Sequence, residues 1–108
     1  MKHRRTKATD ISPKVKAIVW ERDNKCCIIC GKLGSPNSHY ISRAKGGLGI
    51  EQNIVTMCIH CHNAYDNGYD KNFKDNIRRQ TREYLKSKYK NWNEEELIYN
   101  KWKKFGKI

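Results

Sequence analysis

The sequence lacks the features of a membrane or secreted protein. None of its apolar runs approaches the roughly 18 residues that a membrane-spanning helix needs. The basic residues 1–5 are not followed by the apolar stretch of a signal peptide, and repeats and low-complexity runs are missing. Only 37% of the 108 residues are apolar, which implies one domain with a small core. We therefore expect a cytoplasmic protein that needs stabilisation beyond hydrophobic burial.

Acidic residues are scarce and unevenly distributed. The chain has 23 Lys and Arg against 11 Asp and Glu, which gives a formal charge of +12. Residues 1–24 carry seven basic against three acidic side chains, residues 25–70 four against three, and residues 71–108 twelve against five. Basic flanks around a nearly neutral centre favour a polyanion lying across the protein, with a solvated basic surface as the alternative. Membrane-surface binding is disfavoured because the basic segments lack a wide apolar face.

Four of the five cysteines form two C-x-x-C pairs, Cys27–Cys30 and Cys58–Cys61. Four thiolates at this spacing satisfy tetrahedral Zn²⁺. Disulfides are the alternative, but the odd cysteine count and the paired spacing favour zinc in a reducing compartment. Cys26 could replace Cys27, although symmetry with the second pair favours Cys27. Structural zinc contributes roughly 10–16 kcal/mol of apparent free energy in small fingers, so we expect the metal-free chain to be poorly folded.

The segments outside the cysteine pairs predict an arm and several helices. Residues 1–10 are polar and basic, which favours a flexible arm. Ser12-Pro13 is typical of a helix start, and apolar residues recur at helical spacing to about Arg22. Residues 73–88 keep helical spacing through a basic segment that Asn91-Trp92-Asn93 ends. Asn93 with Glu96 resembles a capping box that opens a last helix. The tryptophans are expected in the core rather than as base-stacking platforms: Trp20, Trp92 and Trp102.

The 27 residues from Gly31 to Met57 are more than a minimal zinc ribbon needs, and they predict a β-hairpin. The expected elements are a loop over 33–37, a strand over 39–41, a glycine-rich turn over 44–49 and a returning strand over 54–56. A short helix should then begin near Cys58 and stop at Asn67-Gly68.

A His…Asn…His series runs through this hairpin and helix, in Ser38-His39-Tyr40-Ile41, Gly46-Gly47, Asn53-Ile54-Val55 and Cys61-His62. Over roughly residues 20–70 it resembles the HNH nuclease family, and within it the small nucleases of phages and prophages. The resemblance implies an α+β fold, a small zinc-stapled ββα-metal (HNH) domain with an N-terminal helix and basic C-terminal helices. On this interpretation residues 1–10 are a flexible basic arm, 11–70 the nuclease domain with its structural zinc, and 71–108 a basic helical extension.

The resemblance implies a role for each residue of the series. His39 would be the general base that deprotonates water, a task that suits an imidazole because its pKa lies near working pH. Asn53 would tie down the loop that carries the base. His62 would ligate a divalent catalytic ion, Mg²⁺, Mn²⁺, Ni²⁺ or Zn²⁺, which stabilises charge on the phosphate and leaving oxygen. The alternative for His62 is a capping histidine beside the zinc cysteines.

One position departs from the family pattern. Many members place Asp or His directly before the base as a second metal ligand, where this chain has Ser38, a weak ligand for a hard cation. The site could therefore be inactive. Asp66 lies four residues after His62 on the same expected helix face, and our hypothesis is that it ligates the ion directly or through water. The alternative is that Asp66 contacts a basic neighbour or caps a turn.

Several basic residues are candidate phosphate contacts. Arg43 and Lys45 flank the glycine turn near the base, where they could clamp phosphate or remain solvated. In the C-terminal segment the candidates for backbone phosphates include Arg78, Arg79 and Arg82, and such contacts would make binding strongly salt-dependent. His60, inside the second cysteine pair, is expected to be exposed.

Together these features predict a metal-dependent DNA endonuclease, a phosphodiester hydrolase. The resemblance implies 5′-phosphate and 3′-hydroxyl products from double-stranded DNA, nicked by a monomer or cut on both strands by a homodimer. The alternative is a weak or inactive zinc-containing DNA-binding module. A third interpretation is a structural zinc protein in a phage packaging assembly, because phage relatives often act alongside the terminase. The expected location is the cytoplasm of a bacterial or phage-infected cell.

Overall fold

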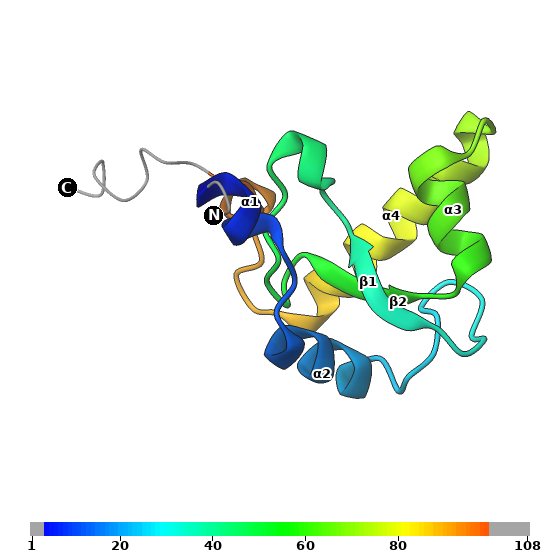
Figure 1. The fold of residues 1–108 in the computed structure, drawn as a ribbon. Coiled ribbons are helices and arrows are strands. Elements are labelled where there is room, and N and C mark those ends of the chain that lie inside the picture. Colours follow the sequence, from blue (N-terminus) through cyan, green and yellow to red (C-terminus); the bar gives the residue numbers. More distant parts are fainter. Residues whose placement is uncertain (1–3, 100–108) are drawn as a thin grey trace.

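The computed structural model describes residues 4–99, which form a small α+β fold around two antiparallel strands (Figure 1). In chain order the elements are α1 (Arg4–Thr9), α2 (Pro13–Arg22), β1 (Ser35–His39), the 3₁₀ turn η1 (Arg43–Lys45), β2 (Ile54–Met57), α3 (Ile59–Asn67), α4 (Lys71–Lys88) and the 3₁₀ turn η2 (Glu94–Leu97). Helix α2 packs beside both strands, whereas α3 follows β2 and packs against α4. No helix within residues 4–99 is both long and apolar enough to cross a membrane.

The hairpin forms, but its first strand begins earlier than the sequence predicts. β1 pairs with β2 with Ser38 opposite Val55 and His39 opposite Ile54, and the register is irregular between Ser35 and Ser38. Residues 35–37, predicted as loop because of their Ser, Pro and Asn, are therefore strand. Of the predicted strand 39–41 only His39 belongs to β1. The entirely buried β2 explains the difference, because an irregular polar strand can pair with it despite poor intrinsic propensity.

The glycine-rich turn contains η1 and depends on two adjacent glycines. Gly46 ends η1 with φ +86°, a left-handed conformation that favours glycine. A Cβ on Gly47 would lie 1.6 Å from the carbonyl oxygen of Ile41. The turn therefore lies so close to Ile41, just after β1, that only glycine fits at position 47.

Helices α2, α3 and α4 follow the sequence signals closely. The Ser12 hydroxyl accepts a hydrogen bond from the Val15 N–H at 3.2 Å and caps α2 as predicted. Helix α3 ends at Asn67 with Gly68 as its cap, and α4 ends at Lys88 before the predicted break. The predicted apolar face of α2 is only partly buried: Val19 is fully buried, whereas Ile18 is 36% exposed.

The predicted last helix is wrong over the part that the structure describes. The Asn93 side chain accepts a hydrogen bond from the Glu95 N–H at 2.9 Å, but it caps only the short turn η2. After Leu97 the backbone is extended and pairs with the glycine turn: the Leu48 N–H donates to the Leu97 carbonyl at 2.7 Å. This pairing competes with helix continuation. Trp102 lies outside the described residues.

The core is continuous from the cysteine pairs to the C-terminal elements. Ile77 and Leu85 of α4, both fully buried, belong to the same cluster as Tyr40, Val55 and the buried cysteines. The segment predicted as an extension therefore contributes to the core. Trp20 and Trp92 are half-buried and donate their indole N–H groups to the carbonyls of Gly34 and Gln52, at 3.0 Å and 2.8 Å.

A buried ion pair that the sequence analysis missed joins α2, β2 and α4. The Arg22 guanidinium donates to the Asp23 carboxylate at 2.7 Å and 3.1 Å, to the Ile54 carbonyl at 2.7 Å and to the Tyr89 hydroxyl at 3.0 Å. The Asp23 side chain is completely buried and accepts from the Thr56 N–H at 2.8 Å and from the Tyr84 hydroxyl. Burial alone would disfavour the charged guanidinium, but the hydrogen bonds to Asp23 and Tyr89 raise the pKa of Arg22.

Asp23→Asn is expected to lower the free energy of unfolding by about 3–5 kcal/mol, because it leaves the Arg22 charge without its buried partner. Urea denaturation of the zinc-loaded protein measures the loss. Asp75→Asn is the matched control, since the Lys71–Asp75 pair at 3.5 Å is exposed and its removal should cost at most about 1 kcal/mol. Equal losses in the two variants would show that the buried pair does not hold the elements together.

Candidate active site and metal centre

The two C-x-x-C pairs meet in one group. The sulfur atoms of Cys27, Cys30, Cys58 and Cys61 all lie within 4.8 Å of one another. Zn–S bonds of about 2.3 Å in a tetrahedron place sulfur atoms about 3.8 Å apart, so the group fits zinc with little movement. All five cysteines are free thiols, and Cys26 lies outside the group. The structure therefore confirms that these four cysteines can bind a structural metal such as zinc, with Cys27 rather than Cys26 in the set.

The local backbone prepares this group for a metal. The Ile29 and Cys30 N–H groups point to the Cys27 sulfur at 3.4 Å and 3.5 Å, and Gly31 closes the knuckle with φ +81°. Cys58 is the N-cap of α3, and its sulfur accepts from the Cys61 N–H at 3.4 Å. That N–H lowers the pKa of Cys58 to about 7, which favours the thiolate that binds metal.

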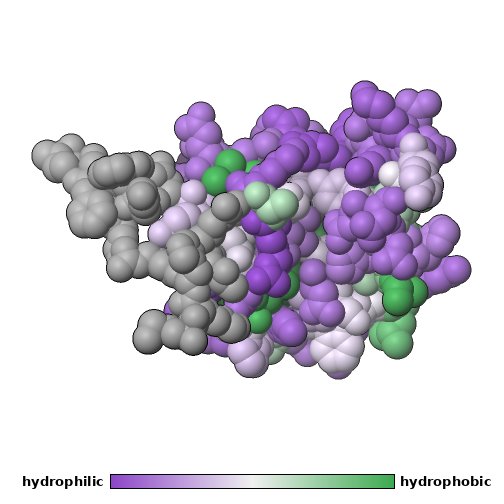
Figure 2. Space-filling view, turned by 45° about the horizontal axis from the view of Figure 1, so that its top comes forward, coloured by the Kyte–Doolittle hydropathy of each residue, from purple (hydrophilic) through white to green (hydrophobic). Residues whose placement is uncertain are grey.

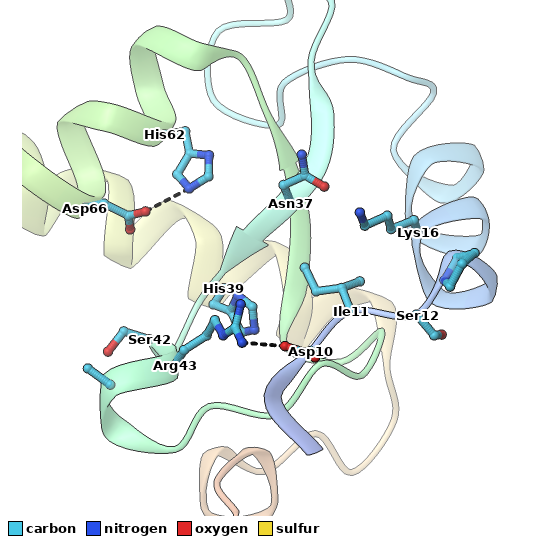
Figure 3. A pocket seen from close by; sticks show the side chains of 12 residues that line it. Asp10, Ile11, Ser12, Lys16, Asn37, His39, Ser42, Arg43, His62 and Asp66 are labelled. Carbon is cyan, nitrogen blue, oxygen red and sulfur yellow. Dashed lines mark hydrogen bonds and ion pairs between the residues drawn. The ribbon is translucent and has the colours of Figure 1, made fainter. Parts of the chain in front are cut away.

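An open cleft of about 890 Å³ lies between α3 and the segment that leads into α2 (Figure 3). His39 enters it from the end of β1, Arg43 from η1, and His62 with Asp66 from α3. Four residues that the sequence analysis singled out, separated by up to 27 positions, thus face one hollow.

The hydrogen bond of the His39 ring selects one tautomer of the neutral imidazole. Its Nε2 lies 2.8 Å from the Thr9 carbonyl oxygen, and because a carbonyl can only accept, Nε2 carries the proton and Nδ1 keeps the lone pair. Partial burial lowers the pKa of His39 below its usual value, and the charge of Arg43 adds to this effect against the opposing Thr9 contact. The neutral imidazole, the form a general base requires, is therefore the favoured one.

Asn53 is completely buried and binds the chain directly after His39. Its side-chain oxygen accepts from the Ile41 N–H at 2.9 Å, and its amide donates to the carbonyls of Ile41 at 3.2 Å and Leu48 at 2.9 Å. Its own carbonyl accepts from the Tyr40 N–H at 2.8 Å. One side chain thus joins the end of β1 to the glycine turn, which limits movement of the segment that carries His39.

His62 and Asp66 lie one turn apart on α3, with His62 Nε2 and Asp66 Oδ2 2.7 Å apart. At this distance Nε2–H donates a hydrogen bond to the Asp66 carboxylate, so Nε2 could ligate a divalent cation only after losing that proton. The sequence left two interpretations of Asp66, a ligand of the ion or a contact of a basic neighbour. This contact is compatible with both, because the basic neighbour is His62. Within residues 4–99, however, the cysteine group is the only cluster of three or more His, Cys, Asp or Glu ligand atoms.

Ser38 does not face the cleft. It is 1% exposed, and its hydroxyl has no hydrogen-bond partner among the described residues. The alternation of β1 explains this, because Asn37 and His39 line the cleft and the residue between them points the other way. The position that carries a metal ligand in many HNH proteins therefore contributes none here. His60 is exposed, as the sequence predicts.

A second hollow of about 270 Å³ adjoins the cleft and shares Ser42 and Asp66 with it. Lys45, Lys74 and Arg78 line it, and the Arg78 guanidinium lies 5.1 Å from the Tyr40 ring centre. Lys74 was not among the predicted contacts, although its position four residues before Arg78 indicates that the two share a helix face.

The remaining predicted phosphate contacts are already engaged and line neither hollow. Arg79 bonds to the side chain of Asn76, and Arg82 pairs with Glu94 at 2.7 Å. At the cleft, Arg43 pairs with Asp10. The face shown in Figure 2 is dominated by hydrophilic residues with a few small hydrophobic patches, as both a polyanion-binding and a solvated surface require.

Comparison with known proteins adds no family to this description: no protein-family model matches the chain, and no curated protein is significantly similar to it. The interpretation of the site therefore depends on its residues and their geometry.

Proposed function

We propose that the protein is a metal-dependent HNH-type endonuclease that hydrolyses DNA phosphodiester bonds. The observation that carries the proposal is the convergence of His39 from β1 with His62 and Asp66 from α3 on one open cleft. Two further features support the proposal. Asn53, a residue of the family motif, binds the chain directly after His39, and the four cysteines form one group next to the helix that carries His62.

The chemistry follows from the atoms in the cleft. His39 Nδ1 takes a proton from a water molecule, and the resulting hydroxide attacks phosphorus as the bond to the 3′ oxygen breaks; the departing oxygen takes a proton from a second water molecule. The products are a 5′-phosphate and a 3′-hydroxyl. Arg43 lines the cleft beside the phosphate, where its pairing with Asp10 partly offsets its positive charge. His62 and Asp66 would hold a divalent ion once the proton between them is displaced, and the ion would supply further charge stabilisation at the phosphate and the leaving oxygen.

DNA is the proposed substrate because cationic side chains lie beside the cleft, and the resemblance to the HNH family favours the double-stranded form. Beyond the cleft, the adjoining hollow is lined by Lys45, Lys74 and Arg78, against the two acidic residues Asp66 and Asp75. Cations in line with the scissile phosphate suit the phosphates that flank it on the same strand. Such contacts carry no base readout, so binding should be non-specific and sensitive to salt.

A second candidate function is a zinc-containing DNA-binding module with weak or no cleavage. Ser38 favours it: with this residue in the interior, the proposed ligands of the ion are reduced to His62 and Asp66. This is a small set for tight ion binding, although Mg²⁺ is often held through one or two carboxylates together with substrate phosphates.

Adding a divalent ion to a preformed complex separates the two functions. An end-labelled duplex is first bound in EDTA, at a concentration that leaves the structural zinc in place, and binding is followed by fluorescence anisotropy. Mg²⁺, Mn²⁺, Ni²⁺ or Zn²⁺ is then added in excess. Labelled product that appears only after the addition, and that His62→Ala and Asp66→Ala reduce, supports the nuclease. Salt-sensitive binding with intact DNA in every ion supports the module instead.

The cleavage rate should fall with acidity only below pH 6.5. The folded protein lowers the pKa of His39 from 6.5, so the neutral base persists to more acidic pH than in a free imidazole, and a bound cation would extend this range. The same shift favours unfolding on acidification, since the unfolded chain takes up the proton first. Single-turnover cleavage rates measured across the acidic pH range give the midpoint of this fall. A midpoint above 6.5 would contradict the assignment of His39.

A further inference from the structure

We propose that residues Ala8–Asp10, here called the strap, position the catalytic base: they hold His39 with its proton on Nε2, and Asp10 lines the cleft beside it. This inference rests on the proposed function, because it gives His39 the role of base. The strap lies in the segment that the sequence analysis assigned to a flexible arm, whereas the structure has α1 at 4–9 and Thr9 is only 3% exposed.

Three contacts attach the strap, each to a different part of the site. The Gly49 N–H donates to the Ala8 carbonyl at 3.0 Å. His39 Nε2 donates to the Thr9 carbonyl at 2.8 Å. The Asp10 carboxylate pairs with Arg43 of η1. Three successive residues thus bind the glycine turn, the base and a cation of the cleft.

Gly49 shows how closely the strap lies against the turn. A Cβ at this position would be 2.0 Å from the Asp10 carbonyl oxygen and 2.5 Å from its carbon. Both are backbone atoms, so a side chain here cannot be accommodated by a rotamer change. The strap must move away for any residue other than glycine.

The Thr9 contact has a chemical consequence for the base. With Nε2–H donated to the Thr9 carbonyl, rotation of the ring is restricted, and the Nδ1 lone pair favours one direction. On the opposite side of the cleft lie His62 and Asp66, while Asp10 and Ile11 form the near wall (Figure 3). The strap therefore orients the lone pair of the base, and Asp10 borders the space in which the phosphate would lie.

Two full-length variants release the strap by different means. Gly49→Ala displaces it sterically, and Asp10→Asn weakens its pairing with Arg43 without adding bulk. Ser12→Ala is the control: it removes the cap of α2 three residues from Thr9 but leaves the three strap contacts intact. Zinc content and circular dichroism confirm the fold of each variant.

The decisive readout is the His39 ring N–H in ¹H–¹⁵N NMR spectra, which is visible only while a hydrogen bond protects it from exchange with water. We expect a protected Nε2–H in wild type and in Ser12→Ala, and its loss in Gly49→Ala and Asp10→Asn. Plasmid nicking by the two strap variants should fall roughly 10- to 100-fold, as for other small displacements of a catalytic group.

A ring N–H that stays protected in both strap variants would overturn the proposal, as would its absence in wild type. Nicking rates within twofold of wild type, with the N–H lost, would show that the contact exists but does not position the base. A protected N–H in a protein that never nicks DNA would reject the proposed nuclease and, with it, the positioning role of the strap. It would leave only the contact itself.

Discussion

Cys27→Ser is expected to unfold the protein, whereas Cys26→Ser leaves it folded. The four-cysteine group joins the loop after α2 to the start of α3, and both pairs border the core. Structural zinc contributes roughly 10–16 kcal/mol of apparent free energy, comparable with or larger than the whole stability of a typical domain, about 5–15 kcal/mol. Serine at one of four ligand positions should remove most of this contribution.

The adjacent cysteines make a matched pair for this test. Cys26 and Cys27 differ by one position, but only Cys27 has its sulfur in the group. Zinc content, measured by mass spectrometry or a chromogenic chelator, should be one per chain in wild type and in Cys26→Ser. Circular dichroism should show a cooperative melt for these two proteins only. A folded Cys27→Ser protein, or an unfolded Cys26→Ser protein, would mean that the ligand set is wrong.

His39→Ala is expected to reduce DNA cleavage by roughly 10²–10⁴-fold, the usual contribution of a general base. The fold should persist, because the ring is half-buried at the rim of the cleft and makes one described hydrogen bond, to Thr9. DNA affinity should change little, since the basic lining of the adjoining hollow is untouched. Single-turnover cleavage of an end-labelled duplex and anisotropy in EDTA measure the two quantities separately.

His60→Ala is the control for loss of an imidazole. His60 lies on α3 near the cleft but is exposed and lines neither hollow, so its removal should leave the rate within about twofold of wild type. Equal losses in the two variants would indicate an effect on charge or metal contamination rather than on proton transfer. Cleavage that survives His39→Ala with an unchanged pH dependence would exclude His39 as the base.

Local signals explain what the sequence predicted well. The ends of α2, α3 and α4 are marked by Ser12, Gly68 and the break after Lys88, and each signal acts within one or two turns. The C-x-x-C spacing similarly fixes two sulfur atoms per knuckle, so only the meeting of the two knuckles had to be inferred.

Pairing between distant segments explains what the sequence could not predict. Residues 35–37 become strand because β2 pairs with them, and the last helix is replaced by extended chain because Leu97 pairs with Leu48. The ion pair of Arg22 and Asp23 was invisible for the same reason, since its partners lie on β2 and α4.

The candidate site was predictable to the level of its motif. His39, Asn53 and His62 were identified from spacing and resemblance, and the structure brings His39 and His62 to one cleft. The partner of the base was not predictable, because it is a backbone carbonyl in a segment with no pattern of its own. The direction of Ser38 likewise depended on where β1 begins, which the composition of residues 33–37 concealed.

The most direct test of the account is a nicking time course with supercoiled plasmid, comparing wild-type protein and His39→Ala at equal zinc content in Mn²⁺ and in EDTA. The account predicts relaxed plasmid from the wild-type protein in Mn²⁺ only, and almost none from the variant. Intact plasmid with every divalent ion, or equal nicking by the two proteins, would contradict it.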